Sequence, residues 1–354
     1  MLVIVRIPVE TLVLIGERFV TSLPVVVISA GALSLVLSLA FGPWLIGWLK
    51  LRFTERIASD SAKLNELHAA KQNTPTMGGL LISATTIFSV LCFSDPSSPV
   101  VWLFCGTVLA FTLLGAYDDW IKLRTQRKGL TARQKLSAQV IMSLGVAVGI
   151  YLLHHEPGSV GTVSIPWSKM TFRPSVYWIP WAVFVIIGAS NAVNLTDGLD
   201  GLASGSAAIS SIALAVVICS SKLAGLDENN RMIAAVSCAA LAGSTLGFLW
   251  WNRHPARIFM GDAGSLPIGG LLAIASLATG TELLLAIIGV VFVVETFSVI
   301  LQVAWYRRTR RRILLCSPLH NHFVFRGVAE TKIVQWFWLA AIVAALLGVS
   351  AAFW

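Results

Sequence analysis

Ten long apolar segments constrain the fold of this chain more than any other feature of its sequence. A helix of about 20 apolar residues spans the hydrocarbon core of a bilayer, because each residue advances the helix by about 1.5 Å. The segments lie near residues 24–48, 78–95, 100–117, 136–153, 176–190, 201–221, 231–250, 265–281, 283–304 and 333–354. This pattern predicts an all-α integral membrane protein with about ten transmembrane helices.

Composition favours one membrane domain over several soluble ones. Of the 354 residues, 56% are hydrophobic and only 12% are charged, whereas about a quarter of the residues in a typical soluble protein are charged. No polar linker divides the chain, so we predict a single polytopic domain over residues 1–354. Glu10, Glu17 and Arg18 interrupt the apolar N-terminal stretch, which favours an interfacial helix within residues 1–23 over a cleaved signal peptide.

The distribution of basic residues predicts the orientation of the chain. Twenty of the 26 lysine and arginine residues lie in alternate connections between the apolar segments, near residues 50–71, 122–135, 253–257 and 307–332. Basic loops remain in the cytoplasm, so we place these connections there and both termini on the outer side. The same asymmetry accounts for the net charge of +9. We therefore expect the basic segments to contact membrane lipids and no nucleic acid.

Unusual polar residues gather in the same cytoplasmic connections. The segments are KQNTPTMGG (71–79), YDDWIK (117–122), NAVNLTDGLDG (191–201), NRHPARIFMGDAGS (252–265) and PLHNHF (318–323), and three of them contain five of the eight aspartates. Placing ionisable groups beside lipid costs free energy, and such groups usually have a function. We therefore predict an active site at the cytoplasmic face.

Two of these segments contain closely spaced carboxylates. Asp118 and Lys122 lie one helical turn apart and share a face, so an interfacial salt bridge is the simplest interpretation of this segment. The adjacent Asp118 and Asp119 repel one another, however, and a cation or a proton relieves the repulsion, which suits a metal site or a general base. Asn191, Asn194 and Asp197 recur every three residues, and Asp200 follows at the same spacing. They form a polar stripe if helical or Asp-Gly turns if not, and we favour a ligand site.

The remaining polar residues suggest a metal and a phosphate ligand. Asp262 opens a predicted helix, where a carboxylate caps the backbone and where phosphates bind. His320 and His322 are two residues apart and so do not share a helix face, which predicts a loop or an extended segment. Carboxylate oxygens without a paired cysteine–histidine set favour Mg²⁺ or Mn²⁺ over zinc. Nearby lysines suit a metal-bridged diphosphate, with one water-soluble and one lipid-borne substrate.

Together these segments resemble a known enzyme family. TPTMGG, DDxxK, NAVNLTDGLDGLA, FLWWN…IFMGDAGS, VFVVETFSVILQV and PLHNHF occur in the order found in the phospho-N-acetylmuramoyl-pentapeptide transferase family, a branch of the polyprenyl-phosphate N-acetylhexosamine-1-phosphate transferases. The resemblance runs from about residue 43 to the C-terminus. It implies a bacterial inner-membrane enzyme that uses Mg²⁺. Such an enzyme moves phospho-MurNAc-pentapeptide from UDP-MurNAc-pentapeptide to undecaprenyl phosphate, giving lipid I and UMP.

The resemblance also assigns roles to residues. It implies that Asp118, Asp119, Asp262 and His320 are catalytic and that Asp262 binds the metal. Phe259 is implied to stack on uracil, and Asn321 stands where the family motif has its middle histidine, so this position cannot act as an acid or base. The resemblance, the polar stripe and the histidine segment together predict a set of substrate-binding residues. These are Lys71, Thr76, Lys122, Asn191, Asn194, Asp197, Gly198, Leu199, Asp200, Asn252, Phe259 and His322.

Two other functions remain open at this point. A sister transferase would use UDP-GlcNAc, although the VFVVET and PLHNHF blocks favour the muramoyl enzyme. A lipid transporter would need charged groups along a path through the bilayer, and Glu295 is the only acidic residue deep in a predicted span. Glu295 is either a buried packing contact or part of a lipid groove. A homodimer and a monomer are both compatible with the sequence.

Overall fold

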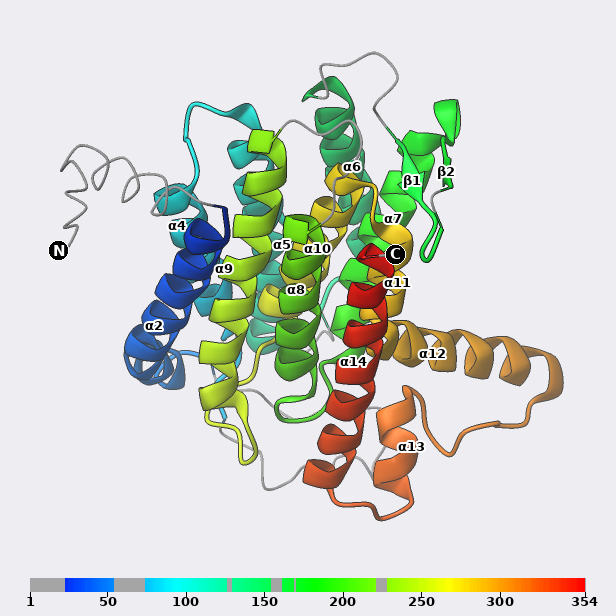
Figure 1. Ribbon diagram of the computed structural model, residues 1–354. Helices are drawn as coiled ribbons and strands as arrows, with labels where there is room; N and C mark the ends of the chain where they lie inside the picture. The colour runs from blue at the N-terminus through cyan, green and yellow to red at the C-terminus, as the bar shows by residue number, and fades with distance from the viewer. Residues whose placement is uncertain are drawn as a thin grey trace, which may run out of the picture.

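The computed structural model describes residues 23–53, 74–125, 129–153, 161–168, 170–220 and 228–353, and most of them are helical (Figure 1). The helices are α2 (Leu23–Lys50), α4 (Gly79–Phe93), α5 (Pro99–Arg124), α6 (Ala132–Leu153), α7 (Trp178–Thr196), α8 (Leu202–Ser220), α9 (Glu228–Asn252), α10 (Asp262–Thr279), α11 (Glu282–Ile288), α12 (Val290–Thr309), α13 (Leu319–Phe325) and α14 (Glu330–Ala352). Within the described residues, nine helices are long and apolar enough to cross a membrane, and α4 is a shorter apolar helix. The predicted all-α membrane architecture is confirmed. Of the predicted N-terminal interfacial helix within residues 1–23, residues 1–22 lie outside the described part, and Leu23 begins α2.

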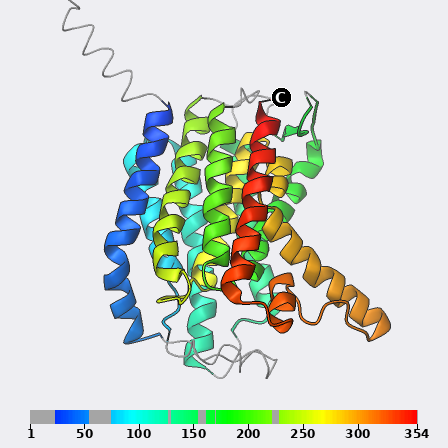
Figure 2. The same cartoon turned by 60° about the horizontal axis from the view of Figure 1, so that its bottom comes forward.

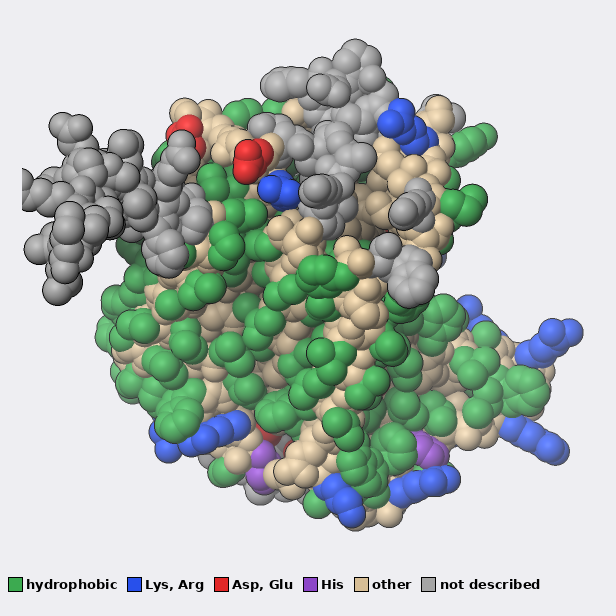
Figure 3. All heavy atoms as spheres, in the orientation of Figure 1, with side chains coloured by type: hydrophobic (Ala, Val, Ile, Leu, Met, Phe, Trp, Pro, Cys, Tyr) green, Lys and Arg blue, Asp and Glu red, His purple; other side chains and the backbone are tan. Residues whose placement is uncertain are grey.

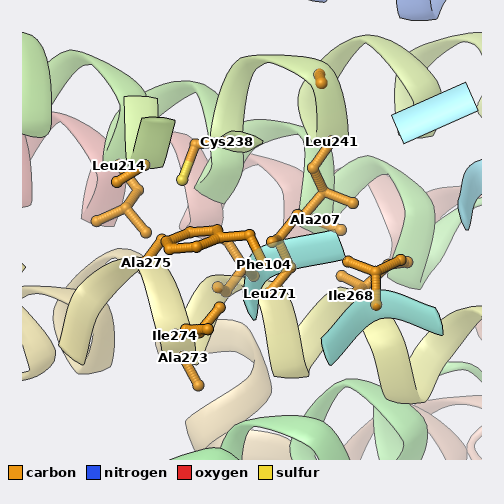
Figure 4. Close-up of a cluster of buried hydrophobic side chains, with 14 of the residues drawn as sticks. Phe104, Ala207, Leu214, Cys238, Leu241, Ile268, Leu271, Ala273, Ile274 and Ala275 are labelled. Carbon is orange, nitrogen blue, oxygen red and sulfur yellow. The ribbon is translucent and has the colours of Figure 1, made fainter. Parts of the chain in front are cut away.

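Helix α10 forms the centre of the bundle. All 18 of its residues are buried, and it packs against α5, α7 and α9. Figure 4 shows side chains of α5, α8, α9 and α10, including Phe104, Leu214, Cys238 and Leu271, meeting in one apolar cluster. Close packing of this kind fixes the position of a helix, because interiors have little free volume. The first residue of α10, Asp262, is therefore held in place by the core beneath it.

The ninth predicted span is not one helix. Gly289 separates α11 from α12 and has φ −88° and ψ 25°, so the backbone leaves the α-helical path there. Glycine lacks a Cβ and resists helix continuation. After the break, α12 diverges from the bundle (Figures 1 and 2). Its exposed Phe297, Ile300 and Leu301 suit contact with lipid rather than with other helices.

A small sheet at the opposite end from α13 was not predicted. Strands β1 (Val163–Ser164) and β2 (Thr171–Phe172) pair antiparallel, with Val163 opposite Phe172. The backbone N–H of Ser164 donates to the carbonyl of Gly280 at 2.9 Å, so the hairpin is fixed to the turn that joins α10 and α11. Two-residue strands are too short to show an alternating pattern in the sequence.

Basic side chains mark one end of the bundle. In Figure 3, lysine, arginine and histidine side chains gather at the lower end of the molecule and at the tip of α12, and hydrophobic side chains cover the band above them. We call this end, which carries residues 50–53, 117–125, 129–135, 252–262 and 307–332, the basic face. All the polar segments that the sequence singled out, so far as they are described, end at this face.

Candidate active site

Three carboxylates from two helices meet at the basic face. Asp118 and Asp119 lie in the last two turns of α5, and Asp262 is the first residue of α10. One oxygen of each carboxylate lies within 4.8 Å of an oxygen of each of the others, and all three residues are buried. The sequence placed them in one site, and the packing of α5 against α10 brings them together.

Two lysines neutralise most of the negative charge. Lys122 Nζ lies 2.8 Å from Asp118 Oδ2, 3.2 Å from Asp119 Oδ1 and 3.0 Å from Asp262 Oδ2. Lys135 Nζ, from α6, lies 2.6 Å from Asp262 Oδ2 and 3.8 Å from Asp118 Oδ2. The prediction from their spacing that Asp118 and Lys122 share a face is confirmed. Lys135 was expected only to contribute to the topology, and its place in the site was not predicted.

Backbone groups fix the orientation of the acidic pair. The N–H of Leu130 donates to Asp118 Oδ1 at 2.6 Å, and the N–H of Ala263 donates to Asp119 Oδ2 at 3.1 Å. The second bond uses one of the free amide groups at the start of α10. Each aspartate therefore keeps one oxygen directed by the backbone and presents the other to lysine.

Glycine is required immediately before α10. Gly261 has φ +69°, and a Cβ at this position would lie 2.5 Å from Asp119 Oδ2 and 3.0 Å from Thr76 Oγ1. Only glycine adopts this conformation at little strain and leaves this space. The same contact places the predicted substrate-binding residue Thr76 beside the carboxylates. The predicted residue Lys71 lies outside the described residues.

The polar stripe is helical over its first two members. Helix α7 continues to Thr196, six residues beyond the predicted span. Asn194 Nδ2 donates to Asp262 Oδ1 at 2.6 Å and to Ser265 Oγ at 2.9 Å. Asn191, one turn earlier, donates to Gln139 Oε1 at 2.9 Å. Asn194 therefore belongs to the carboxylate cluster, which also gains Ser265, a residue that the sequence analysis did not single out.

Asp200 and Asn252 hold the loop between α9 and α10 against the turn between α7 and α8. Asp200 Oδ2 accepts the N–H of Ala256 at 3.1 Å and lies 3.1 Å from His254 Nδ1. Asn252 Oδ1 accepts the N–H of Gly201 at 3.0 Å. Both side chains are buried. Their hydrogen bonds position the loop that leads to Asp262.

Phe259 lies on this loop and is half-buried. Its N–H donates to the carbonyl of Pro75 at 2.8 Å, and its own carbonyl accepts the N–H of Gly78 at 2.8 Å. The loop is therefore paired, as in a short β-bridge, with the segment that carries Thr76. This pairing fixes the backbone of Phe259 two residues before Gly261 while its ring stays partly exposed. Asp197, which follows α7, is half-buried at the start of the turn between α7 and α8.

The two histidines lie in a short helix, so the predicted loop or extended segment is wrong. Helix α13 begins after Pro318, and the N–H of His320, which has no partner within the helix, donates to Glu295 Oε1 at 3.1 Å. His320 is buried, and its Nδ1 lies 3.2 Å from Glu295 Oε2. The imidazole also contacts Gly198, because a Cβ there would overlap His320 Nε2. Leu199 packs in the apolar cluster shared by α13 and α14.

His322 is directed elsewhere. It is half-buried, and its Nδ1 accepts the N–H of Leu315 at 3.1 Å. Partial burial and the nearby Arg326 lower the pKa of His322, which favours the neutral ring that can accept this bond. The structure thus brings His320 to the turn between α7 and α8 and ties His322 to the loop before α13.

The carboxylate cluster can hold a divalent metal ion. Three carboxylates within 4.8 Å of one another supply the oxygen ligands that hard cations prefer. Lys122 and Lys135 leave the five groups with a formal charge of −1, so a divalent ion would make the cluster positive. A positively charged cluster at the mouth of a helix bundle binds phosphate oxygens.

Comparisons with known proteins agree with this geometry. Residues 101–280 match the model of glycosyl transferase family 4, and residues 71–82 match signature 1 of the phospho-N-acetylmuramoyl-pentapeptide-transferases. A phospho-N-acetylmuramoyl-pentapeptide-transferase of Solidesulfovibrio magneticus is 42% identical over 337 residues, 91% of each chain. The chain belongs to the phospho-N-acetylmuramoyl-pentapeptide-transferase family.

Other members of the phospho-N-acetylmuramoyl-pentapeptide-transferase family show the same extent of similarity. The protein of Thermodesulfovibrio yellowstonii is 40% identical over 316 residues, 86% of each chain. The protein of Francisella tularensis subsp. novicida is 38% identical over 348 residues, 95% of this chain and 94% of its own. The family model covers α5 to α10, and therefore both ends of the carboxylate cluster, and the family signature includes Thr76.

Proposed function

We propose that this chain transfers phospho-MurNAc-pentapeptide from UDP-MurNAc-pentapeptide to undecaprenyl phosphate, giving lipid I and UMP. The observation that carries this proposal is the buried cluster of three aspartates and two lysines at the basic face. Phosphoryl transfer needs positioning and charge neutralisation more than covalent chemistry, and this cluster offers both. The relatives are named phospho-N-acetylmuramoyl-pentapeptide-transferases, and the proposed activity is the one that this name describes.

The location of the cluster suits two substrates of different solubility. We place the chain in the bacterial inner membrane with its basic face in the cytoplasm, because basic loops stay on that side. A nucleotide-linked sugar then reaches the cluster from water. A polyprenyl phosphate reaches the same cluster from the bilayer, with its chain in lipid and its phosphate at the surface.

The residues of the cluster divide the reaction among them. Asp262 would hold Mg²⁺, which when bound neutralises charge on the diphosphate of the donor. Lys122 and Lys135 bind phosphate oxygens. Asp118 takes a proton from the acceptor phosphate, whose oxygen then attacks the β-phosphorus of the donor as UMP leaves. Asn194 orients Asp262 through the 2.6 Å hydrogen bond to Oδ1.

The uridine end of the donor binds beside the loop before α10. The half-buried ring of Phe259 offers a face for the base, and Thr76, Asp197, Gly198 and Leu199 lie in the adjoining segments. Asn191 and Asn252 support these segments through the bonds described above. The charged end of the donor then extends towards Asp262.

Replacing Phe259 with alanine is expected to weaken donor binding and leave acceptor binding unchanged. Loss of an aromatic ring that stacks on a base lowers affinity by about 5- to 150-fold, since such stacking contributes about 1–3 kcal/mol. Titration calorimetry with UDP-MurNAc-pentapeptide measures this change. Phe93→Ala is the matched control, because Phe93 is also half-buried. It is the last residue of α4, at the end of that helix away from the segment that carries Thr76. Unchanged donor affinity in Phe259→Ala would remove Phe259 from the site.

A turnover assay tests the proposed function directly. The purified protein is expected to convert UDP-MurNAc-pentapeptide and undecaprenyl phosphate into UMP and an organic-extractable product. Turnover of UDP-GlcNAc instead would identify a sister transferase. Movement of undecaprenyl phosphate from one leaflet of a vesicle membrane to the other, without release of UMP, would identify a transporter. Turnover of UDP-GlcNAc alone or such lipid movement would each overturn the proposal.

A further inference from the structure

Glu295 and His320 form a buried pair between α12 and α13. Glu295 is 0% exposed and His320 is 1% exposed. Glu295 Oε1 accepts the backbone N–H of His320 at 3.1 Å, and Glu295 Oε2 lies 3.2 Å from His320 Nδ1. One carboxylate therefore faces both the backbone and the ring of the same histidine. The buried packing contact, one of the two interpretations of Glu295 from the sequence, is confirmed.

The arrangement leaves little choice for the proton on the ring. Glu295 Oε2 and His320 Nδ1 are both buried, and neither has a hydrogen bond to any other group among the described residues. The two atoms lie 3.2 Å apart, so each can serve as the partner of the other, and a buried polar atom left unpaired costs about 1–3 kcal/mol. A carboxylate only accepts, so the pair is satisfied when Nδ1 carries the proton and donates it to Oε2.

The other ring nitrogen faces the turn between α7 and α8. A Cβ on Gly198 would overlap His320 Nε2 and would lie 2.7 Å from Cε1. The absence of a side chain at Gly198 thus lets the Nε2 edge of the ring lie directly against this turn. This turn follows directly from α7, the helix whose Asn194 bonds to Asp262.

We propose that Glu295 is a positioning residue that holds the proton of His320 on Nδ1 and thereby presents an unprotonated Nε2 to the active site. An unprotonated Nε2 can accept a proton or a hydrogen bond from a bound phosphate or hydroxyl group. Glu295 acts only through His320 and does not touch a reacting atom. The role of His320 rests on the proposed function, whereas the position of its proton does not.

Substitution of Glu295 by glutamine inverts the arrangement. The backbone N–H of His320 can only donate, so the single oxygen of a glutamine must accept it. The amide NH₂ group then faces Nδ1, which must become the acceptor. The proton of the neutral ring therefore moves from Nδ1 to Nε2, with little change in side-chain volume.

Nitrogen-15 NMR of ring-labelled histidine measures this inversion without any activity assay. At about pH 8, above the ordinary pKa of imidazole, we expect the His320 signals of the unsubstituted protein to report Nδ1–H, and those of Glu295→Gln to report Nε2–H. His320→Asn assigns the signals by their loss. Glu282→Gln is the matched control, since Glu282 is also a buried glutamate, lies at the opposite end of the bundle and should leave the spectrum unchanged.

Kinetics supply the second readout. We expect Glu295→Gln to lower kcat by about 10²-fold with little change in the KM for the donor, because a misplaced proton impairs proton transfer more than binding. Glu282→Gln should keep near-normal turnover. A structural defect would instead lower the folded fraction of Glu295→Gln.

Three outcomes would overturn the inference. These are an Nε2–H ring in the unsubstituted protein, a ring protonated on both nitrogens at that pH, and a proton that stays on Nδ1 in Glu295→Gln. The first two need no variant, so the inference stays testable if Glu295→Gln does not fold. Absence of turnover in the unsubstituted protein would refute the proposed function, while the NMR result would still decide the position of the proton.

Discussion

Asp262→Asn is expected to lower turnover by about 10³-fold, the loss of about 4 kcal/mol of charge stabilisation in the transition state. The carboxamide is nearly isosteric and its oxygen can still accept the hydrogen bond from Asn194, so the fold is retained. It carries no negative charge, however, and Lys122 and Lys135 each lose an ion-pair partner. We expect the required Mg²⁺ concentration to rise as well.

Two measurements separate metal binding from general damage. Electron paramagnetic resonance of Mn²⁺, used as a probe for the site, should show weaker metal binding to Asp262→Asn. This measurement does not depend on turnover. Asp95→Asn is the control, because Asp95 is exposed and its side chain accepts hydrogen bonds from Ser97, away from the carboxylate cluster. Near-normal turnover of Asp262→Asn at limiting Mg²⁺ would show that Asp262 does not hold the metal.

Asp118→Asn is expected to lower turnover by about 10³-fold, since general-base catalysis contributes about 10²- to 10⁴-fold. Donor binding should persist. The carboxamide oxygen can keep the 2.6 Å bond from the N–H of Leu130, which preserves the end of α5. It cannot take the proton of the acceptor phosphate. Asp119 stays tied to α10 through Ala263 and does not replace it.

The same residues could act through a covalent intermediate, and the two mechanisms predict different products. In the alternative, Asp118 or Asp119 attacks the donor and forms an acyl-phosphate, which releases UMP before the acceptor binds. We expect no release of UMP when undecaprenyl phosphate is absent. A stoichiometric burst of UMP, with a phosphosugar trapped on Asp118 or Asp119, would refute the single displacement.

Hydropathy predicted most of the fold because a bilayer restricts the choice of structure. Backbone groups in lipid must be bonded within their own segment, so each long apolar stretch forms a helix. The break at Gly289 did not appear in hydropathy, since both sides of it are apolar. Two-residue strands such as Val163–Ser164 were missed for a related reason, because their pairing depends on a turn that hydropathy does not describe.

The site was predicted to different depths at different positions. Asp118, Asp119 and Asp262 stood out because carboxylates are rare in so apolar a chain. Lys135 did not, because a lysine in a basic connection is explained by topology alone. Glu295 was recognised as unusual, but its partner His320 lies 25 residues away on a separate helix, and the sequence gives no measure of that proximity.

The sequence alone determined that the chain is a helical membrane protein, which connections between its helices are basic, and which polar residues are out of place in lipid. These properties follow from local composition and from the energy of transferring side chains into a bilayer. Only the tertiary structure decided which of those residues meet. Asp119 contacts the start of α10, Asn194 contacts Asp262, and Glu295 contacts His320. Each contact depends on how helices distant in sequence pack around the buried α10, and packing is a property of the whole chain rather than of any segment.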